Sequence, residues 1–168
     1  MALKKTAELS PEEALVKAKN DAFRLLSFRA RSVSELRERL VKKKYASETV
    51  EETLSFCLKQ GFLDDEKFAK LYAISRVQSR PSGKRLIQTE LKNKGLSPAV
   101  VNRALGAIED FDEKELAFET ALKRYQRMRG LPEKTSKARI YGFLSRRGFS
   151  SEAVFYSLSK LYKNAGME

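Results

Sequence analysis

The chain contains no histidine, no tryptophan and a single cysteine, Cys57, among its 168 residues. Without histidine it can form neither a Ser-His-Asp triad nor a Cys-His catalytic pair, and zinc sites of the Cys/His type are excluded as well. One cysteine allows no internal disulfide, which is typical of proteins of the reducing cytosol. The composition therefore argues against an enzyme built on these groups and predicts a cytoplasmic protein without a cofactor or metal site.

Long apolar runs are also missing from the sequence. No stretch approaches the roughly 18 apolar residues that cross a bilayer. The N-terminal segment MALKKTAELSPEEAL lacks the apolar region of a signal peptide. We therefore expect neither a membrane span nor a secretory signal.

Glycine and proline are scarce, with eight and four residues, and apolar residues recur at spacings of three and four. This is the period of an amphipathic helix, and no sustained alternation typical of strands is present. Cap signals at Ser10-Pro11, Ser32, Asp64-Asp65 and Ser97-Pro98 mark helix starts. The sequence predicts nine helices, near residues 11–29, 33–44, 48–60, 65–80, 83–94, 98–109, 112–129, 136–147 and 151–163.

The predicted helices fall into three groups that share one apolar pattern. Five apolar positions recur with the same relative spacing, and the copies lie 51 and 53 residues apart. The copies are Leu36, Leu40, Tyr45, Val50 and Leu54; Ile87, Leu91, Leu96, Val101 and Leu105; and Ile140, Leu144, Phe149, Val154 and Leu158. Three copies of one core pattern predict three copies of one three-helix unit.

We therefore expect an all-α fold of three tandem three-helix repeats that form an elongated, curved array. In this organisation residues 1–10 are an N-terminal extension, and the three units span residues 11–60, 61–110 and 111–165. A unit of about 50 residues has a marginal core on its own, so contacts between neighbouring units are expected to add stability.

The chain has 34 Lys and Arg against 22 Asp and Glu, which gives a net charge of +12. Each predicted unit is basic, and the excess gathers on the middle helix of each unit and its flanks, where the segments 28–44, 76–94 and 134–147 each have a net charge of +5. The candidate binding residues in these segments are Arg31, Arg37, Arg39, Lys42, Lys43, Lys44, Arg80, Lys84, Arg85, Lys92, Lys94, Lys137, Arg139, Arg146 and Arg147.

Two interpretations of this charge remain open. The cations can be ordinary solvated surface, in which Lys and Arg also favour the C-terminal end of a helix. Alternatively, units stacked in register would form a basic stripe suited to a polyanion, either nucleic acid or a protein filament coated on nucleic acid. Binding of the second kind would weaken with salt, because counterions are released from the polyanion.

Other candidate motifs favour structural roles. Asp64 and Asp65 are adjacent, so their side chains diverge by about 100° on a helix and favour capping over a metal or acid–base site. Cys57 lies in an apolar helical segment and is expected to be a buried small apolar residue. The aromatic residues lie mostly at core spacings, which favours packing over stacking on bases. A nuclease would need acids clustered on one face, and the sequence does not offer them.

Four segments resemble the RecX family of bacterial regulatory proteins: RSVSELRERLVKKKY, GFLDDEKFAKLYAISR, GKRLIQTELKNKGLS and KARIYGFLSRRGFSSEAV. These segments lie between residues 31 and 154. The resemblance covers about residues 24–160, and the order of an LDD..FA segment followed by GK..I...L..KG is fairly specific. One departure is Lys44-Tyr45, where the other two units have a turn glycine, and it leaves the geometry of the first turn open.

The resemblance implies a non-enzymatic modulator of the RecA recombinase, built of tandem three-helix units. Family members bind the filament of RecA on single-stranded DNA and inhibit its ATPase, strand-exchange and co-protease activities, and some also bind DNA directly. The expected partners are thus a RecA-type filament and single-stranded DNA, with double-stranded DNA as a further candidate, and a monomer without membrane contact is expected. A general nucleic-acid-binding helical protein without a recombinase partner is the alternative.

Overall fold

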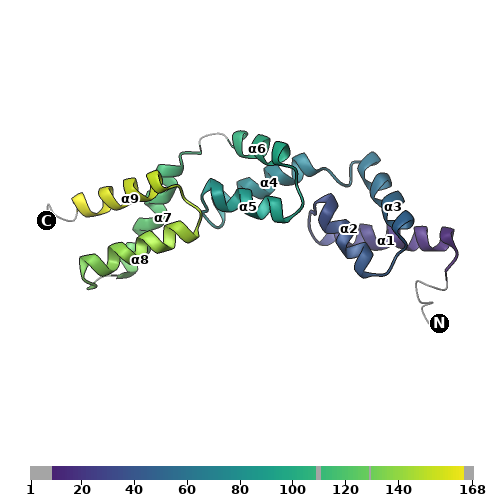
Figure 1. Ribbon diagram of the computed structural model, residues 1–168, viewed down its shortest axis with the longest axis horizontal. Helices are drawn as coiled ribbons and strands as arrows, with labels where there is room; N and C mark the ends of the chain where they lie inside the picture. Colours follow the sequence, from purple (N-terminus) through teal and green to yellow (C-terminus); the bar gives the residue numbers. More distant parts are fainter. Residues whose placement is uncertain (1–8, 109–110, 129, 165–168) are drawn as a thin grey trace. The chain divides into compact units, whose positions relative to one another are not determined.

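The structure is a computed structural model, and it describes residues 9–108, 111–128 and 130–164. All regular structure within these ranges is helical (Figure 1), as the apolar period predicts. The helices are α1 (Pro11–Phe28), α2 (Val33–Lys42), α3 (Ser47–Lys59), α4 (Asp65–Gln78), α5 (Lys84–Asn93), α6 (Pro98–Gly106), α7 (Glu113–Tyr125), the 3₁₀ turn η2 (Gln126–Met128), α8 (Glu133–Arg146) and α9 (Ser151–Asn164). No described helix is both long and apolar enough to span a bilayer.

The predicted helix boundaries agree closely with the observed ones. The largest shift at a start is in α8, which begins at Glu133 instead of residue 136, because Pro132 takes the cap position and Glu133 enters the first turn. Two predicted ends, residues 109 and 129, lie outside the described residues, as do residues 1–8 of the expected N-terminal extension and residue 165 of the last unit.

Serine caps set the starts of α1 and α2. The Ser10 hydroxyl accepts the Glu13 amide at 3.2 Å, and the Glu13 carboxylate accepts the Ser10 amide at 2.9 Å. Ser32 and Glu35 repeat this arrangement at 3.1 and 3.3 Å. Each capping box satisfies two backbone donors that the helix itself cannot pair, so these starts are encoded locally.

The chain forms two compact units. The first comprises the described residues up to Ala69 together with Lys92–Val100, and the second comprises Lys70–Leu91 and the described residues from Val101 onward. The middle group of helices, α4 to α6, therefore contributes residues to both units.

In the first unit, α1, α2 and α3 pack around one apolar core. Its buried members are Ala18, Ala22, Leu36, Leu40, Tyr45, Val50, Leu54, Cys57 and Leu63. The Tyr45 hydroxyl donates to Asp21 at 2.8 Å, so the polar tip of this buried ring has a partner. Cys57 is fully buried, as expected, and burial raises the pKa of its thiol.

The second unit contains the matching core of α7, α8 and α9. Its buried members are Ala117, Ala121, Met128, Ile140, Leu144, Phe149, Ala153, Val154 and Leu161. At its edge Tyr125 and Tyr162 meet edge to face, with their ring centroids 5.4 Å apart. The Tyr162 hydroxyl also lies 2.6 Å from the Ser136 hydroxyl, which gives both groups a hydrogen bond.

The repeated apolar pattern predicts the core correctly. Among the fifteen recurring positions, only Leu105 and Leu158 are half-buried, and all the others are buried. The pattern succeeds because a helix with one apolar stripe can remove that stripe from water only by turning it toward its neighbours.

Candidate nucleic-acid interface

Nine of the fifteen predicted cations are exposed and form no ion pair with a described residue. We call these the open cations. They are Arg39, Lys42 and Lys44 on α2 and its following turn; Arg80, Lys84, Arg85 and Lys92 on α5 and its flank; and Arg139 and Arg146 on α8. Cations without a nearby carboxylate keep their full charge available for an anionic partner, so they are the strongest candidates for the interface.

The six other predicted cations already have partners. Arg37 pairs with Glu51, Lys43 with Asp21 and Lys137 with Glu133. The Nε of half-buried Arg31 donates to the Leu25 carbonyl at 3.1 Å. Burial, and then the neighbouring charges of Arg29 and Arg39, lower the pKa of Arg31. The two remaining residues, Lys94 and Arg147, lie at joints between successive three-helix groups.

At the joint in the first unit, Lys94 contacts the start of α2. Its Nζ donates to Glu35 at 2.8 Å, and the Arg29 guanidinium donates to both oxygens of the same carboxylate at 3.0 and 3.1 Å. Burial alone would raise the pKa of Glu35, but these two cations and the Ser32 amide lower it to about 2. The Ser32 hydroxyl completes the joint by donating to the Lys94 carbonyl at 2.6 Å.

The joint in the second unit uses Arg147 in the equivalent position. Its guanidinium donates to the Pro81 carbonyl at 2.9 Å, and its own carbonyl accepts the Gly83 amide at 2.8 Å. Burial, followed by the nearby charges of Arg80 and Arg76, lowers the pKa of Arg147. Arg76 itself is paired with Glu90. Positive charge is thus concentrated beside this joint, with Arg80 as its open cation.

A carboxylate from the following three-helix group caps the second helix at both joints. Asp65, at the first position of α4, accepts the Val33 amide of α2 at 2.9 Å. Glu113, at the first position of α7, accepts the Lys84 amide of α5 at 2.9 Å. A helix start carries unpaired amides and partial positive charge, so each carboxylate stabilises a start and joins two groups at once.

Two glycines permit the close approach at these joints. A Cβ added to Gly95 would lie 2.3 Å from the Cβ of Ser34, and one added to Gly148 would lie 2.4 Å from the Leu86 amide nitrogen. Both glycines also have positive φ, at +79° and +74°. The turn of each later group therefore packs directly onto the second helix of the group before it.

The predicted capping role of the Asp64-Asp65 pair is confirmed, with a refinement. Asp64 caps its own helix, since its Oδ1 accepts the Lys67 amide at 2.9 Å. Asp65 reaches α2 instead, and burial raises the pKa of its carboxyl. Nowhere in the described ranges do three or more Cys, Asp or Glu side chains come together as possible metal ligands.

Some aromatic residues depart from the expected packing. Phe28 is 80% exposed, Phe155 59% and Phe62 52%. Phe62 still meets the Phe23 ring edge to face at 5.2 Å, and Phe155 lies beside Tyr141 with the ring centroids 6.1 Å apart. Core packing is therefore the wrong expectation for these three rings, of which Phe28 is the last residue of α1 and Phe62 lies in the turn beyond α3.

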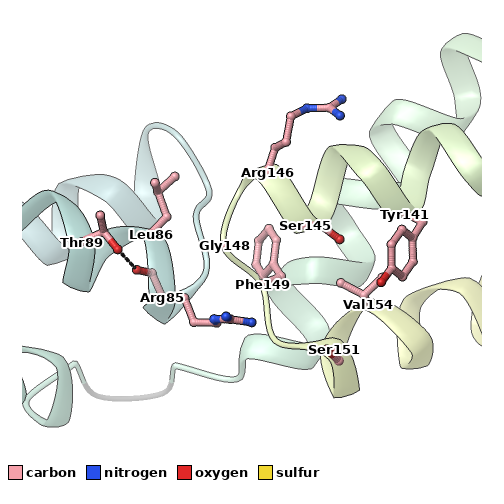
Figure 2. Close-up of a pocket in the computed structure, with 10 residues that line it drawn as sticks. All are labelled: Arg85, Leu86, Thr89, Tyr141, Ser145, Arg146, Gly148, Phe149, Ser151 and Val154. Carbon is pink, nitrogen blue, oxygen red and sulfur yellow. Dashed lines mark hydrogen bonds between the residues drawn. The ribbon is translucent and has the colours of Figure 1, made fainter.

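The second unit contains a hollow of about 360 Å³ between the start of α5, the end of α8 and the start of α9 (Figure 2). Two open cations, Arg85 and Arg146, line it together with the polar residues Thr89, Ser145 and Ser151. No described residue that lines it is acidic. Its geometry follows from the joint, because Gly148 brings the α8–α9 turn against α5.

Three domain models of one family match the chain in order. They are described as RecX, first, second and third three-helix domain, and they match residues 18–57, 64–105 and 112–158. The chain belongs to the RecX family. The matches confirm both the resemblance seen in the sequence and the three tandem three-helix domains that its apolar repeat predicts.

Individual RecX proteins agree with this assignment. The regulatory protein RecX of Amycolatopsis mediterranei is 33% identical over 96% of this chain and 93% of its own length, and that of Vibrio vulnificus is 38% identical over 86% and 93%. The crystal structure of a regulatory protein RecX superposes with a TM-score of 0.77 at 26% identity, covering 98% of this chain and 80% of that one. RecX from Lactobacillus salivarius, 20% identical, shares the fold with a TM-score of 0.75, covering 88% of this chain and 96% of that one.

The first RecX domain has Lys44 where the other two domains have a turn glycine, and the backbone conformation accounts for this difference. Lys44 has φ of +64°, the same left-handed conformation as Gly95 and Gly148, so the first turn has the geometry of the other two. Its side chain is exposed, whereas the two glycines pack onto a preceding domain. A side chain is therefore tolerated in the first RecX domain, at the cost of a conformation that L residues adopt rarely.

The joint carboxylates were not among the predicted site residues. Their signal is an acid at the first position of the first helix in the second and third RecX domains, Asp65 and Glu113. From the sequence alone, such an acid is interpreted as a cap of its own helix. Only the packing of successive domains shows that it caps a different one.

Proposed function

We propose that this protein binds the filament that a RecA-type recombinase forms on single-stranded DNA, and that it inhibits the ATPase, strand-exchange and co-protease activities of that filament. The observation that carries the proposal is that the second helix of each of the three RecX domains presents open cations. Arg39 and Lys42 serve in the first domain, Arg85 and Lys92 in the second, and Arg139 and Arg146 in the third. Each domain thus offers its own contact to a polyanion.

The three binding units are residues 11–60, 61–110 and 111–165, and residues 1–10 form an extension. Three weak contacts on one chain raise each other's effective concentration, so the whole protein should bind far better than any single unit. It acts as a monomer in the cytoplasm, without catalysis, and single-stranded DNA is its nucleic-acid partner, with double-stranded DNA as a further candidate.

The test reverses open cations in two domains at once. A variant with Arg39→Glu, Lys42→Glu, Arg85→Glu and Lys92→Glu should lose inhibition of a RecA-type ATPase on single-stranded DNA. These positions avoid Arg37, whose reversal would place a second carboxylate against its ion-pair partner Glu51. The parent should inhibit at less than one molecule per recombinase subunit. A variant with only two reversals, both in one domain, should lose inhibition only partly.

A matched control reverses four exposed cations outside the predicted set: Lys59, Lys67, Lys123 and Arg127. It changes the net charge by the same amount and should inhibit nearly as well as the parent. If the first variant inhibits like the parent at moderate salt, the open cations are only solvated surface and the proposal is wrong.

The basic charge alone favours a second candidate, a nucleic-acid-binding protein without a recombinase partner. It predicts that the parent binds free single-stranded DNA but leaves the ATPase unchanged until enough protein is present to cover the DNA. Titrating the parent against free DNA and against the ATPase in parallel separates the two candidates.

A further inference from the structure

The hollow in the second unit combines three features that no single helix could supply. Figure 2 shows the Arg85 side chain extending from α5 toward the turn that leads into α9, while Tyr141 extends from α8 toward Val154. Leu86, Phe149 and Val154 provide the apolar part of the lining. A cation, a flat ring and an apolar wall thus meet in one space.

The polar side of the hollow suits a phosphate group. Arg85 is exposed and forms no ion pair with a described residue. The Thr89 hydroxyl already donates its proton to the Arg85 backbone carbonyl at 2.9 Å, which leaves the Arg85 guanidinium as the main donor for a phosphate. The acid next to Ser151, Glu152, is paired with Lys114 at 2.7 Å, so its charge is offset. Guanidinium groups bind phosphate through charge-assisted hydrogen bonds, which are the strong kind.

The ring side of the hollow suits a nucleobase. Tyr141 is 45% exposed and lies beside the exposed Phe155 ring, so an aromatic surface remains open to solvent. Every base offers a face that stacks on such a ring. The volume, about 360 Å³, lies at the lower end of the range for small-molecule sites and is sufficient for one nucleotide.

We propose that this hollow is a nucleotide subsite, in which Arg85 holds a phosphate and Tyr141 stacks on the base. The inference rests on the proposed function, because it makes the hollow one subsite on the basic surface of α5 and α8. Arg146 turns away from the other lining side chains in Figure 2, so it belongs to the rim and is not given a contact with the nucleotide. The nucleotide can belong to a single strand or be free, since both present the same phosphate and base.

The experiment uses the full chain and a single-stranded thymidine octamer that carries one 2-aminopurine. Binding of the parent should quench the 2-aminopurine fluorescence, because the base stacks on Tyr141. Tyr141→Ala should lose the quenching and about tenfold in affinity, while Tyr141→Phe should keep both. Phe28→Ala, which removes an exposed ring outside the hollow, should behave like the parent.

A matched pair of variants tests the contact between Arg85 and the phosphate. Arg85→Gln should weaken octamer binding about tenfold, since one charge-assisted hydrogen-bond pair is lost. Arg127→Gln removes the same charge from an exposed residue that does not line the hollow and should change the affinity less than about twofold. All mutated side chains are exposed, and unchanged thermal unfolding of each variant confirms that it folds. The proposal is overturned if Tyr141→Ala quenches like the parent, or if Arg85→Gln is no weaker than Arg127→Gln.

Competition identifies the ligand. Millimolar dAMP that restores the fluorescence of the parent would show that a free nucleotide fills the subsite. Binding of the octamer that dAMP does not displace assigns the subsite to a strand. A polyglutamate peptide that competes with the octamer as well on Tyr141→Ala as on the parent would make the hollow an anion site for acidic peptides and overturn the proposal.

The ATPase assay separates this inference from the proposed function. If the parent inhibits the recombinase and the hollow variants bind the octamer like the parent, only the subsite is wrong. If the parent quenches through Tyr141 but never inhibits, the subsite stands and the proposed function fails.

Discussion

At the scale of single residues, the turns between the second and third helices show how one backbone conformation meets different surroundings. Lys44, Gly95 and Gly148 all have positive φ, but the two glycines also pack against a preceding domain. Gly61 has φ of +72° with nothing within 4 Å of an added Cβ, so it is a natural control for the backbone effect alone.

We therefore expect Gly148→Ala to destabilise the protein by about 3 kcal/mol, the sum of left-handed strain and overpacking against Leu86. Gly61→Ala should cost only the strain, about 1 kcal/mol. Urea unfolding of both variants measures the difference. Equal losses would mean that the joint yields easily and that the close approach adds little.

The carboxyl group of Glu35 makes the stability of the joint in the first unit depend on pH. Because its pKa is lowered from an ordinary value of 4.5 to about 2 in the folded protein, its contribution to stability is present above pH 4.5 and is lost as the pH falls toward 2. The groups around it are Arg29, Lys94 and the neighbouring carboxyl of Asp65.

Glu35→Gln should lower the free energy of unfolding by about 1–3 kcal/mol at neutral pH, because two charge-assisted contacts are weakened. The difference from the parent should shrink between pH 4.5 and about 2, as the parent's own carboxylate becomes protonated. Glu38→Gln, an exposed acid on the same helix, is the control. A difference that stays constant over this range would contradict the linkage.

At the scale of elements, the capping boxes of α1 and α2 look alike in sequence but have different partners. Ser10 is exposed and caps only its own helix. Ser32 is fully buried, and its hydroxyl accepts from Glu35 and donates to the Lys94 carbonyl. The same motif is thus a local cap in one helix and part of a joint in the other.

Ser10→Ala should cost about 1 kcal/mol, the usual value of an N-cap. Ser32→Ala should cost about 2–3 kcal/mol, because it also removes the hydrogen bond to the Lys94 carbonyl. Thermal unfolding of the two variants side by side tests this order. Similar losses would show that the Ser32 contact with Lys94 contributes little.

At the scale of the whole molecule, a net charge of +12 is distributed over all three domains, and the open cations are those of the fifteen predicted residues that are exposed and form no ion pair with a described residue. The affinity for single-stranded DNA should therefore fall steeply with salt, with a slope of log affinity against log salt near −0.7 for each phosphate contact.

Neutralising one open cation in each compact unit, Lys42→Gln with Arg85→Gln, should make that slope less negative by about 1.4. Lys67→Gln with Lys123→Gln, exposed lysines outside the predicted set, should leave it unchanged. Fluorescence anisotropy over a range of salt concentrations gives both slopes. Equal changes in the two variants would mean that the charge acts diffusely and not through the open cations.

The helices, their caps, the threefold repeat and nearly the whole core could be predicted from the order of the amino acids. These features depend on neighbours three or four residues apart, or on one apolar stripe per helix, and both can be read along the chain. The RecX resemblance was visible for the same reason, because its motifs are these turns and stripes.

Which cations are open depends instead on how the helices pack together. Lys94 pairs with Glu35 at a separation of 59 residues, and Arg147 reaches the Pro81 carbonyl across 66. Charge counts along the chain treat these residues like Arg85 or Lys42, since pairing depends on which helices pack together. The hollow beside Arg85 and Tyr141 was hidden for the same reason: its walls come from α5, α8 and α9, and packing at Gly148 is what brings them together.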